Sequence, residues 1–317
     1  MKNQINNKLK SIKFKQLCFF ILAFISTSIC HAADMPFDSS EKALQAIYNF
    51  KFTQANVLIN ESLTNGDSTS FNLLKTNFYW WMIISGEDNP STRKSYIHSV
   101  NQSLKILDKK NKAELSNKDI EQYIQSYALK VRIELLNHNF MSGFIHLNNC
   151  VSYLKKSFLK EPEYEMFNLT SGLYNYFVTR SQKDHPFLVP YLIFYPKGNM
   201  ETGIMQLMTA YKTKNPILKT EAGYFLMKIY LEQEKDYKKA EFFARDLLNK
   251  YPDNLIFRYY FFKSLLIQNK IDHAIDESIK INSLANKNSE LTSVQRSHFD
   301  DLTKNDLENY YLKNPIK

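Results

Sequence analysis

The sequence predicts an all-α fold made of stacked antiparallel helix pairs, and three observations support this. Glycine accounts for only 7 of 317 residues, which argues against turn-rich β architectures. Residues 257–267 are almost wholly aromatic and aliphatic, as in a helix that is buried between neighbouring helices. Finally, Ala240 and Ala274 stand 34 residues apart in similar surroundings, and such an interval is typical of helical repeat arrays.

The repeat is clearest in residues 221–254. Tyr237 stands three residues before Ala240, and Pro252 follows twelve residues later in a Pro-Asp-Asn sequence. This pattern resembles the tetratricopeptide repeat (TPR), which has an aromatic residue before a small one in its second helix and a Pro-Asx-Asn-like turn. One residue of slack is needed to place Tyr230 at the first-helix tyrosine of that family.

The next unit, residues 255–285, keeps the same register. Ile271 precedes Ala274 by three residues, as Tyr237 precedes Ala240. The resemblance implies a single TPR-like domain over residues 33–317, folded as a right-handed α-solenoid. A helix near residues 290–312 is expected to cap its open end, because terminal repeats need a polar outer face.

Weaker copies of the pattern lie upstream. They are marked by Phe52 with Ala55, by Phe140 with Gly143 and Cys150, and by Gly172 with Gly203 and Ala210. The expected helix pairs are 41–50 with 54–63 and 120–137 with 141–157, and a further pair at 69–85 and 91–109 lacks the motif. A generic array of helical hairpins is the structural alternative.

The N-terminus has the composition of a secretory signal peptide. Residues 1–15 carry five lysines and no acidic residue, and residues 17–29 form a short apolar run. Cys30-His31-Ala32 then offers small residues for cleavage after Ala32. The sequence therefore predicts a signal peptide at 1–32, a periplasmic or secreted protein and no transmembrane segment after cleavage, with an uncleaved anchor as the alternative.

The charge balance argues against a nucleic-acid partner. The chain has 41 Lys and Arg against 32 Asp and Glu, but five of these lysines belong to the leader. The remaining lysines are interspersed with acidic residues, as on solvated helices, and do not gather in the basic face that nucleic-acid binding requires.

Residues 181–198 interrupt the repeat pattern with a Pro-rich apolar insertion. Pro186, Pro190 and Pro196 punctuate a run of aromatic and aliphatic residues, so a long regular helix is not expected there. In one interpretation the insertion folds onto the helical stack and adds a local core. In the other it is a partner-binding or membrane-touching element, because exposed apolar patches usually mark interaction sites.

The sequence carries no recognisable catalytic or cofactor-binding motif. It has no Gly-rich phosphate loop, and the one close pairing of a histidine beyond the leader with a Cys or His is His146 with Cys150, four residues apart, which is too few ligands for a metal site. Cys150 is the one cysteine outside the leader and is expected to be a buried core residue. We therefore predict no catalytic residue, no cofactor and no metal site.

These observations favour a protein-binding or scaffold module of the bacterial cell envelope, with a protein or peptide partner. The candidate partner-binding residues are aromatic: Trp80, Trp81, Tyr174, Phe187, Tyr191, Phe194, Tyr224 and Tyr259. Two alternatives stay open, an enzyme or enzyme subunit with a pocket at residues 181–198, and a structural protein that self-assembles.

Overall fold

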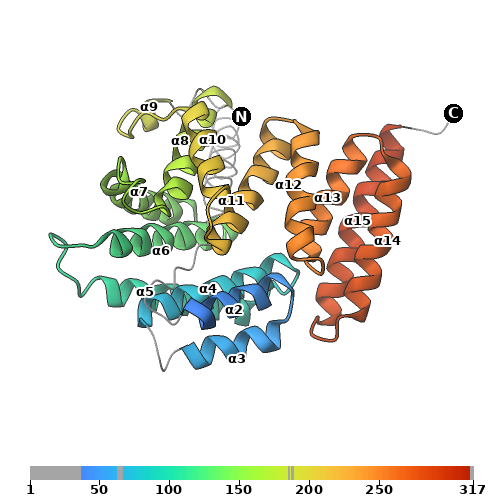
Figure 1. The fold of residues 1–317 in the computed structure, drawn as a ribbon, viewed down its shortest axis with the longest axis horizontal. Helices are drawn as coiled ribbons and strands as arrows, with labels where there is room; N and C mark the ends of the chain where they lie inside the picture. The colour runs from blue at the N-terminus through green and yellow to red at the C-terminus, as the bar shows by residue number, and fades with distance from the viewer. Residues whose placement is uncertain (1–36, 63–66, 185, 187–188, 315–317) are drawn as a thin grey trace, which may run out of the picture. The chain divides into compact units, whose positions relative to one another are not determined.

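The computed structural model describes residues 37–62, 67–184, 186 and 189–314, except for the side chains of residues 37–39 and 191 (Figure 1). Over these residues the regular secondary structure is entirely helical, without a strand, which confirms the all-α prediction. The signal peptide predicted at 1–32 lies outside the described residues. Within the described part, no helix combines the length and apolar character needed to cross a membrane.

The helices follow one another with short connections. In chain order they are α2 (Phe37–Tyr48), α3 (Phe52–Ser62), α4 (Ser68–Ile84), α5 (Pro90–Leu107), α6 (Asn117–Leu136), α7 (Phe140–Ser157), α8 (Phe167–Asp184), α9 (Val189–Leu192), α10 (Met200–Tyr211), α11 (Pro216–Lys228), the π-helix η2 (Ile229–Gln233), α12 (Tyr237–Lys250), α13 (Leu255–Ile267), α14 (Ile271–Lys287) and α15 (Ser293–Lys313).

The chain forms two compact units, whereas the sequence analysis treats residues 33–317 as one domain. Residues 97–219 form the contiguous unit. The described residues from 37 to 96 and from 220 to 314 together form the discontinuous unit. The boundaries between the units fall within α5 and α11.

The same tight turn joins the helices of four pairs. Its hallmark is a non-glycine residue in the left-handed region, where a side chain normally costs energy. The four residues are Phe50 (φ 57°), His138 (φ 60°), Lys235 (φ 54°) and Asn269 (φ 57°). Each stands two residues before the second helix begins and five residues before a small residue, namely Ala55, Gly143, Ala240 and Ala274. The helix pairs are therefore repeated in backbone conformation as well as in sequence.

The small residues lie where two helices approach closely. Ala55, Ala240 and Ala274 are fully buried. At Gly143, an added Cβ atom would lie 3.2 Å from Cδ2 of Leu135 on the preceding helix. A larger side chain at these positions would push the paired helices apart, which explains why the sequence keeps alanine or glycine there.

The π-helix η2 accounts for the one residue of slack in the repeat at 221–254. Sixteen residues separate Tyr224 from Ala240, but fifteen separate Tyr259 from Ala274. In η2 the amide of Glu234 donates to the carbonyl of Ile229 at 2.9 Å, an i to i+5 bond that holds one residue more than an α-turn. The extra residue is thus absorbed inside the first helix, and the second helix keeps its register.

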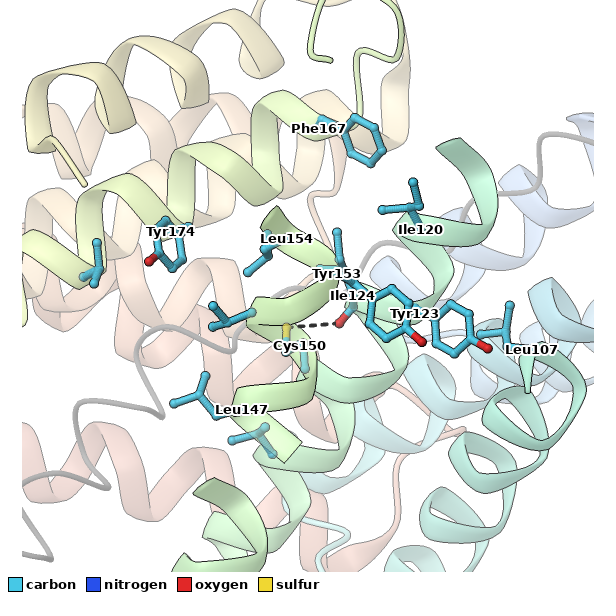
Figure 2. Packing of buried hydrophobic residues seen from close by; sticks show 14 of the residues in the cluster. Leu107, Ile120, Tyr123, Ile124, Leu147, Cys150, Tyr153, Leu154, Phe167 and Tyr174 are labelled. Carbon is cyan, nitrogen blue, oxygen red and sulfur yellow. Dashed lines mark hydrogen bonds between the residues drawn. The ribbon is translucent and has the colours of Figure 1, made fainter. Parts of the chain in front are cut away.

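The contiguous unit is built on α6, α7 and α8, whose buried side chains form one core (Figure 2). The rings of Tyr123 and Tyr153 stack with centroids 4.1 Å apart. Cys150 is buried beside them, and its thiol contacts the carbonyl of Ile124 at 3.5 Å. These contacts are consistent with the core position expected for Cys150.

The helices marked in the sequence by Gly172 and Gly203, α8 and α10, pack through these two glycines. A Cβ atom on Gly203 would lie 2.6 Å from the backbone nitrogen of Tyr176 and 2.8 Å from the carbonyl oxygen of Gly172. Because backbone meets backbone here, no side chain fits at Gly203. The close contact holds the pair together although the insertion separates its helices in sequence.

In the discontinuous unit, the first helices pack against the last ones. The Tyr48 hydroxyl donates to the buried Glu221 carboxylate, and the Asn254 amide donates to the Tyr48 carbonyl at 2.7 Å. Farther along, the Gln295 amide donates to the Ser85 hydroxyl at 2.7 Å. Repeat arrays of the open type have contacts between neighbouring repeats alone, so this long-range packing is a feature that the sequence analysis did not predict.

The recurring turn generates a prediction about Lys235. Lys235→Gly should raise the free energy of unfolding by roughly 0.5–1 kcal/mol, because glycine adopts a left-handed conformation without strain. The same change at the exposed Lys280, inside α14, should lower it by about 1 kcal/mol. Urea unfolding of both variants tests the turn, and a loss of stability in both would contradict the strained conformation.

Candidate functional site

A strip of tyrosines and lysines lies along α11 and α13 of the discontinuous unit. It consists of Tyr224 and Lys228 on α11 and of Tyr259, Tyr260 and Lys263 on α13, and all five side chains are partly exposed. Their chain neighbours Phe225, Phe261 and Phe262 are buried. Each helix therefore buries its phenylalanines and leaves the tyrosine–lysine strip partly exposed.

Lys228 joins the two halves of the tyrosine–lysine strip. Its ammonium nitrogen lies 5.7 Å from the ring centre of Tyr224 on its own helix and 5.7 Å from that of Tyr260 on α13. Lys263 stands in the same relation to Tyr259, at 5.5 Å. Cation–π contacts of this length hold the lysine heads over aromatic faces, so charge and ring alternate along one continuous surface.

The surface continues onto α15. The Tyr259 hydroxyl donates to Oδ2 of Asp306 at 2.8 Å. Beside this bond lies a pocket of about 230 Å³ between the C-terminal parts of α13 and α15. It is lined by Lys263, Leu266, Ile267, Asp306, Asn309, Tyr310, Lys313 and Asn314.

Burial sets the ionisation of the strip. It raises the pKa of Tyr260 well above the ordinary value for tyrosine. Burial and the Asp306 carboxylate together raise the pKa of Tyr259. Burial alone would lower the pKa of Lys228, but Tyr260, Tyr224 and Glu232 outweigh it and raise that pKa. Tyr259 and Tyr260 are therefore neutral and Lys228 is positively charged at neutral pH.

Four of the predicted aromatic residues belong to the discontinuous unit. Trp81 is 2% exposed, and its ring centre lies 6.3 Å from that of Tyr224. Tyr224 and Tyr259 both belong to the tyrosine–lysine strip. Trp80 is partly exposed and packs on Tyr96 at 6.2 Å. Trp81 is therefore a core residue, whereas Tyr224 and Tyr259 are partly exposed.

The other predicted residues belong to the contiguous unit. Tyr174 is buried, and its hydroxyl donates to the Pro196 carbonyl at 2.6 Å. Phe194 is 83% exposed. Tyr191 lies in α9, but its side chain and the whole of Phe187 lie outside the described residues.

Lys228, Tyr260 and Lys263 are not among the candidate residues of the sequence analysis, which interprets the lysines on helices as solvated surface. A signal was nevertheless present. The pattern Tyr-x-x-x-Lys occurs at 224–228 and again at 259–263, 35 residues later. Residues four apart lie on the same helix face, so this spacing at the repeat interval pointed to one shared surface.

Two further features bear on chemistry. Among the described residues, no group of three or more His, Cys, Asp and Glu side chains is placed to hold a metal ion. In the contiguous unit, Glu121 is fully buried and accepts hydrogen bonds from the Gln125 amide and, at 3.4 Å, from the Tyr164 hydroxyl. Burial raises the pKa of Glu121 to about 8, although the two hydrogen bonds oppose this shift.

Comparisons with known proteins give no relative. No protein family, no curated protein and no solved structure matches the chain.

The buried Glu121 carboxyl generates a prediction about pH. In the folded protein Glu121 holds its proton up to about pH 8, whereas in the unfolded chain it loses it near its ordinary pKa of 4.5. The native state therefore binds more protons between these values, and its stability falls as pH rises through this range. Glu121→Gln should remove this loss, on the order of 2–4 kcal/mol between pH 5 and pH 8.

Urea unfolding at several pH values measures this effect. Glu163→Gln, at an exposed position of the same unit, is the matched control and should keep the native pH profile. If Glu121→Gln and the native protein lose stability in parallel from pH 5 to pH 8, the raised pKa is wrong.

Proposed function

We propose that this protein is an exported TPR-like module that binds an extended segment of a partner protein along the tyrosine–lysine strip. The observation that carries the proposal is the repeated Tyr-x-x-x-Lys pattern, whose two copies touch through Lys228 and Tyr260. In a TPR-like array the first helices of successive repeats line one face. A ligand that spans two repeats meets both copies.

Three features support the TPR-like part of the proposal. The same left-handed turn recurs in four helix pairs. A small buried residue follows each of these turns at the same distance. The π-turn between Tyr224 and Ala240 removes the one irregularity in the clearest repeat. The right-handed solenoid remains part of this proposal, with the long-range packing of α2–α4 as an addition to it.

The chemistry of the strip defines the segment that fits it. Lysine ammonium groups form charge-assisted hydrogen bonds with carboxylates, and tyrosines offer flat apolar rings with polar ends. A segment with acidic side chains between apolar ones would meet both. The nearby Asp306 accepts a hydrogen bond from Tyr259.

The proposal places the protein outside the cytoplasm and without catalysis of its own. The export part depends on the basic, apolar and small residues of positions 1–32. The binding part depends on the strip, which pairs lysines with phenols in the manner of a recognition surface. Binding a partner segment requires neither a general base nor a substrate-sized cleft.

A cross-linking experiment identifies the ligand. A photoreactive phenylalanine analogue in place of Asn309, which is exposed beside the pocket, should capture the partner segment in cells. The same analogue in place of Ile279, exposed on α14, is the control and should not capture it. The captured segment is then identified by mass spectrometry and synthesised as a peptide.

The affinity of that peptide tests the strip. Lys228→Met with Lys263→Met removes two charges but keeps the aliphatic stems, and it should weaken binding at least tenfold. Lys238→Met with Lys280→Met makes the same change in charge on the second helices α12 and α14, and it should leave the affinity within twofold. Equal affinities for the two double variants would refute the strip as the binding surface.

A further inference from the structure

The Pro-rich insertion of the contiguous unit is anchored at defined points. Leu192 and Tyr195 pack against the unit's core, and the Tyr195 hydroxyl donates to Asn148 on α7. The Tyr174 hydroxyl fixes the Pro196 carbonyl at 2.6 Å. At Gly198 the chain runs so close to α8 that a Cβ atom would lie 2.7 Å from the carbonyl of Asn175.

Between these anchors the chain turns outward. Ile193 and Phe194 form the turn after α9 and are 73% and 83% exposed. Their neighbours on either side, Leu192 and Tyr195, are turned inward. We call Ile193 and Phe194 the apolar tip. A segment that only completed the local core would not expose two adjacent large apolar side chains to water.

The exposed apolar surface continues on α7. Met141 and Ile145 precede Asn148 by seven and three residues and therefore share its helix face. They are 65% and 54% exposed. Since Asn148 accepts the hydrogen bond from Tyr195, this face of α7 adjoins the apolar tip.

Positive charge accompanies this surface. Lys155 follows Asn148 by seven residues on the same face of α7, and Lys197 follows the apolar tip by three residues; both are exposed. Residues 97–219 hold 16 Lys and Arg against 10 Asp and Glu. Residues 32–96 and 220–317 together hold 20 against 22. The excess of positive charge is thus confined to the unit that carries the tip.

We propose that the apolar tip, Ile193 and Phe194, inserts into an anionic lipid surface while Lys155 and Lys197 contact lipid headgroups. Apolar side chains flanked by lysines are the combination that holds proteins at a charged membrane interface. The tip is small compared with the roughly 800 Å² per partner that a stable protein interface buries. Lipid contact needs no such area, because weak apolar and electrostatic contributions add.

Vesicle co-sedimentation tests this proposal. The native protein and all variants are expressed with residues 1–32 in place. Mass spectrometry determines the N-terminal residue of each purified protein, so that only proteins with the same N-terminus are compared. The native protein should bind vesicles with 30% phosphatidylglycerol and bind pure phosphatidylcholine at least tenfold less. Ile193→Ser with Phe194→Ser should weaken binding to the anionic vesicles at least tenfold, and Lys155→Glu with Lys197→Glu should do the same.

The control changes a phenylalanine and an isoleucine of similar exposure in the other unit. Phe242→Ser with Ile279→Ser, at side chains 58% and 62% exposed, should bind as the native protein does. Thermal unfolding checks that every variant is folded, as expected for exposed positions. Unchanged binding by the tip variant, or equal native binding to both kinds of vesicle, would overturn the proposal.

Failure of the native protein to bind anionic vesicles would overturn it as well. If the native protein then sediments as a dimer that the tip substitutions dissociate, the occupant of the surface is a second copy of the chain. None of these results depends on the tyrosine–lysine strip, whose peptide affinity is measured separately.

Discussion

The discontinuous unit depends on an aromatic contact between its first and last helices. The ring of Tyr48 lies edge-on to Trp81 at 5.2 Å and to Tyr251 at 5.1 Å, and Trp81 lies edge-on to Phe257 at 5.8 Å. Joining residues so far apart in sequence costs loop entropy, which buried aromatic surface offsets. Phe257 lies on α13, and Trp81 also packs on Tyr224 of α11 at 6.3 Å. Because the cluster contacts both helices, the tyrosine–lysine strip has a defined geometry.

The helix pairs were predictable because their signals are local. Small residues at a fixed distance from a turn, as at Ala240 and Ala274, mark a helix seam wherever they occur. The contacts of Tyr48 with Glu221 and of Ser85 with Gln295 leave no such mark. Their partners lie in helices whose relative placement depends on the whole fold, so periodicity predicted the pairs but not the division of the chain into two units.

Side-chain exposure in the candidate regions was harder still to predict. Leu192 and Ile193 are neighbours of almost equal hydrophobicity, yet the first packs on the core and the second is 73% exposed. Trp80 and Trp81 differ in the same way. Composition identified both places as unusual. Only the packing of the surrounding helices decides which residue of each pair faces solvent.

The split of the discontinuous unit has a consequence for the order in which the chain folds. Residues 97–219 are synthesised as one piece and can complete their core as soon as they emerge. Helices α2–α4 are made earlier but must wait, since Phe50 meets Asn288 across 238 residues. Contacts of such long range form slowly. The first helices are therefore the part of the chain most in need of protection by chaperones during synthesis.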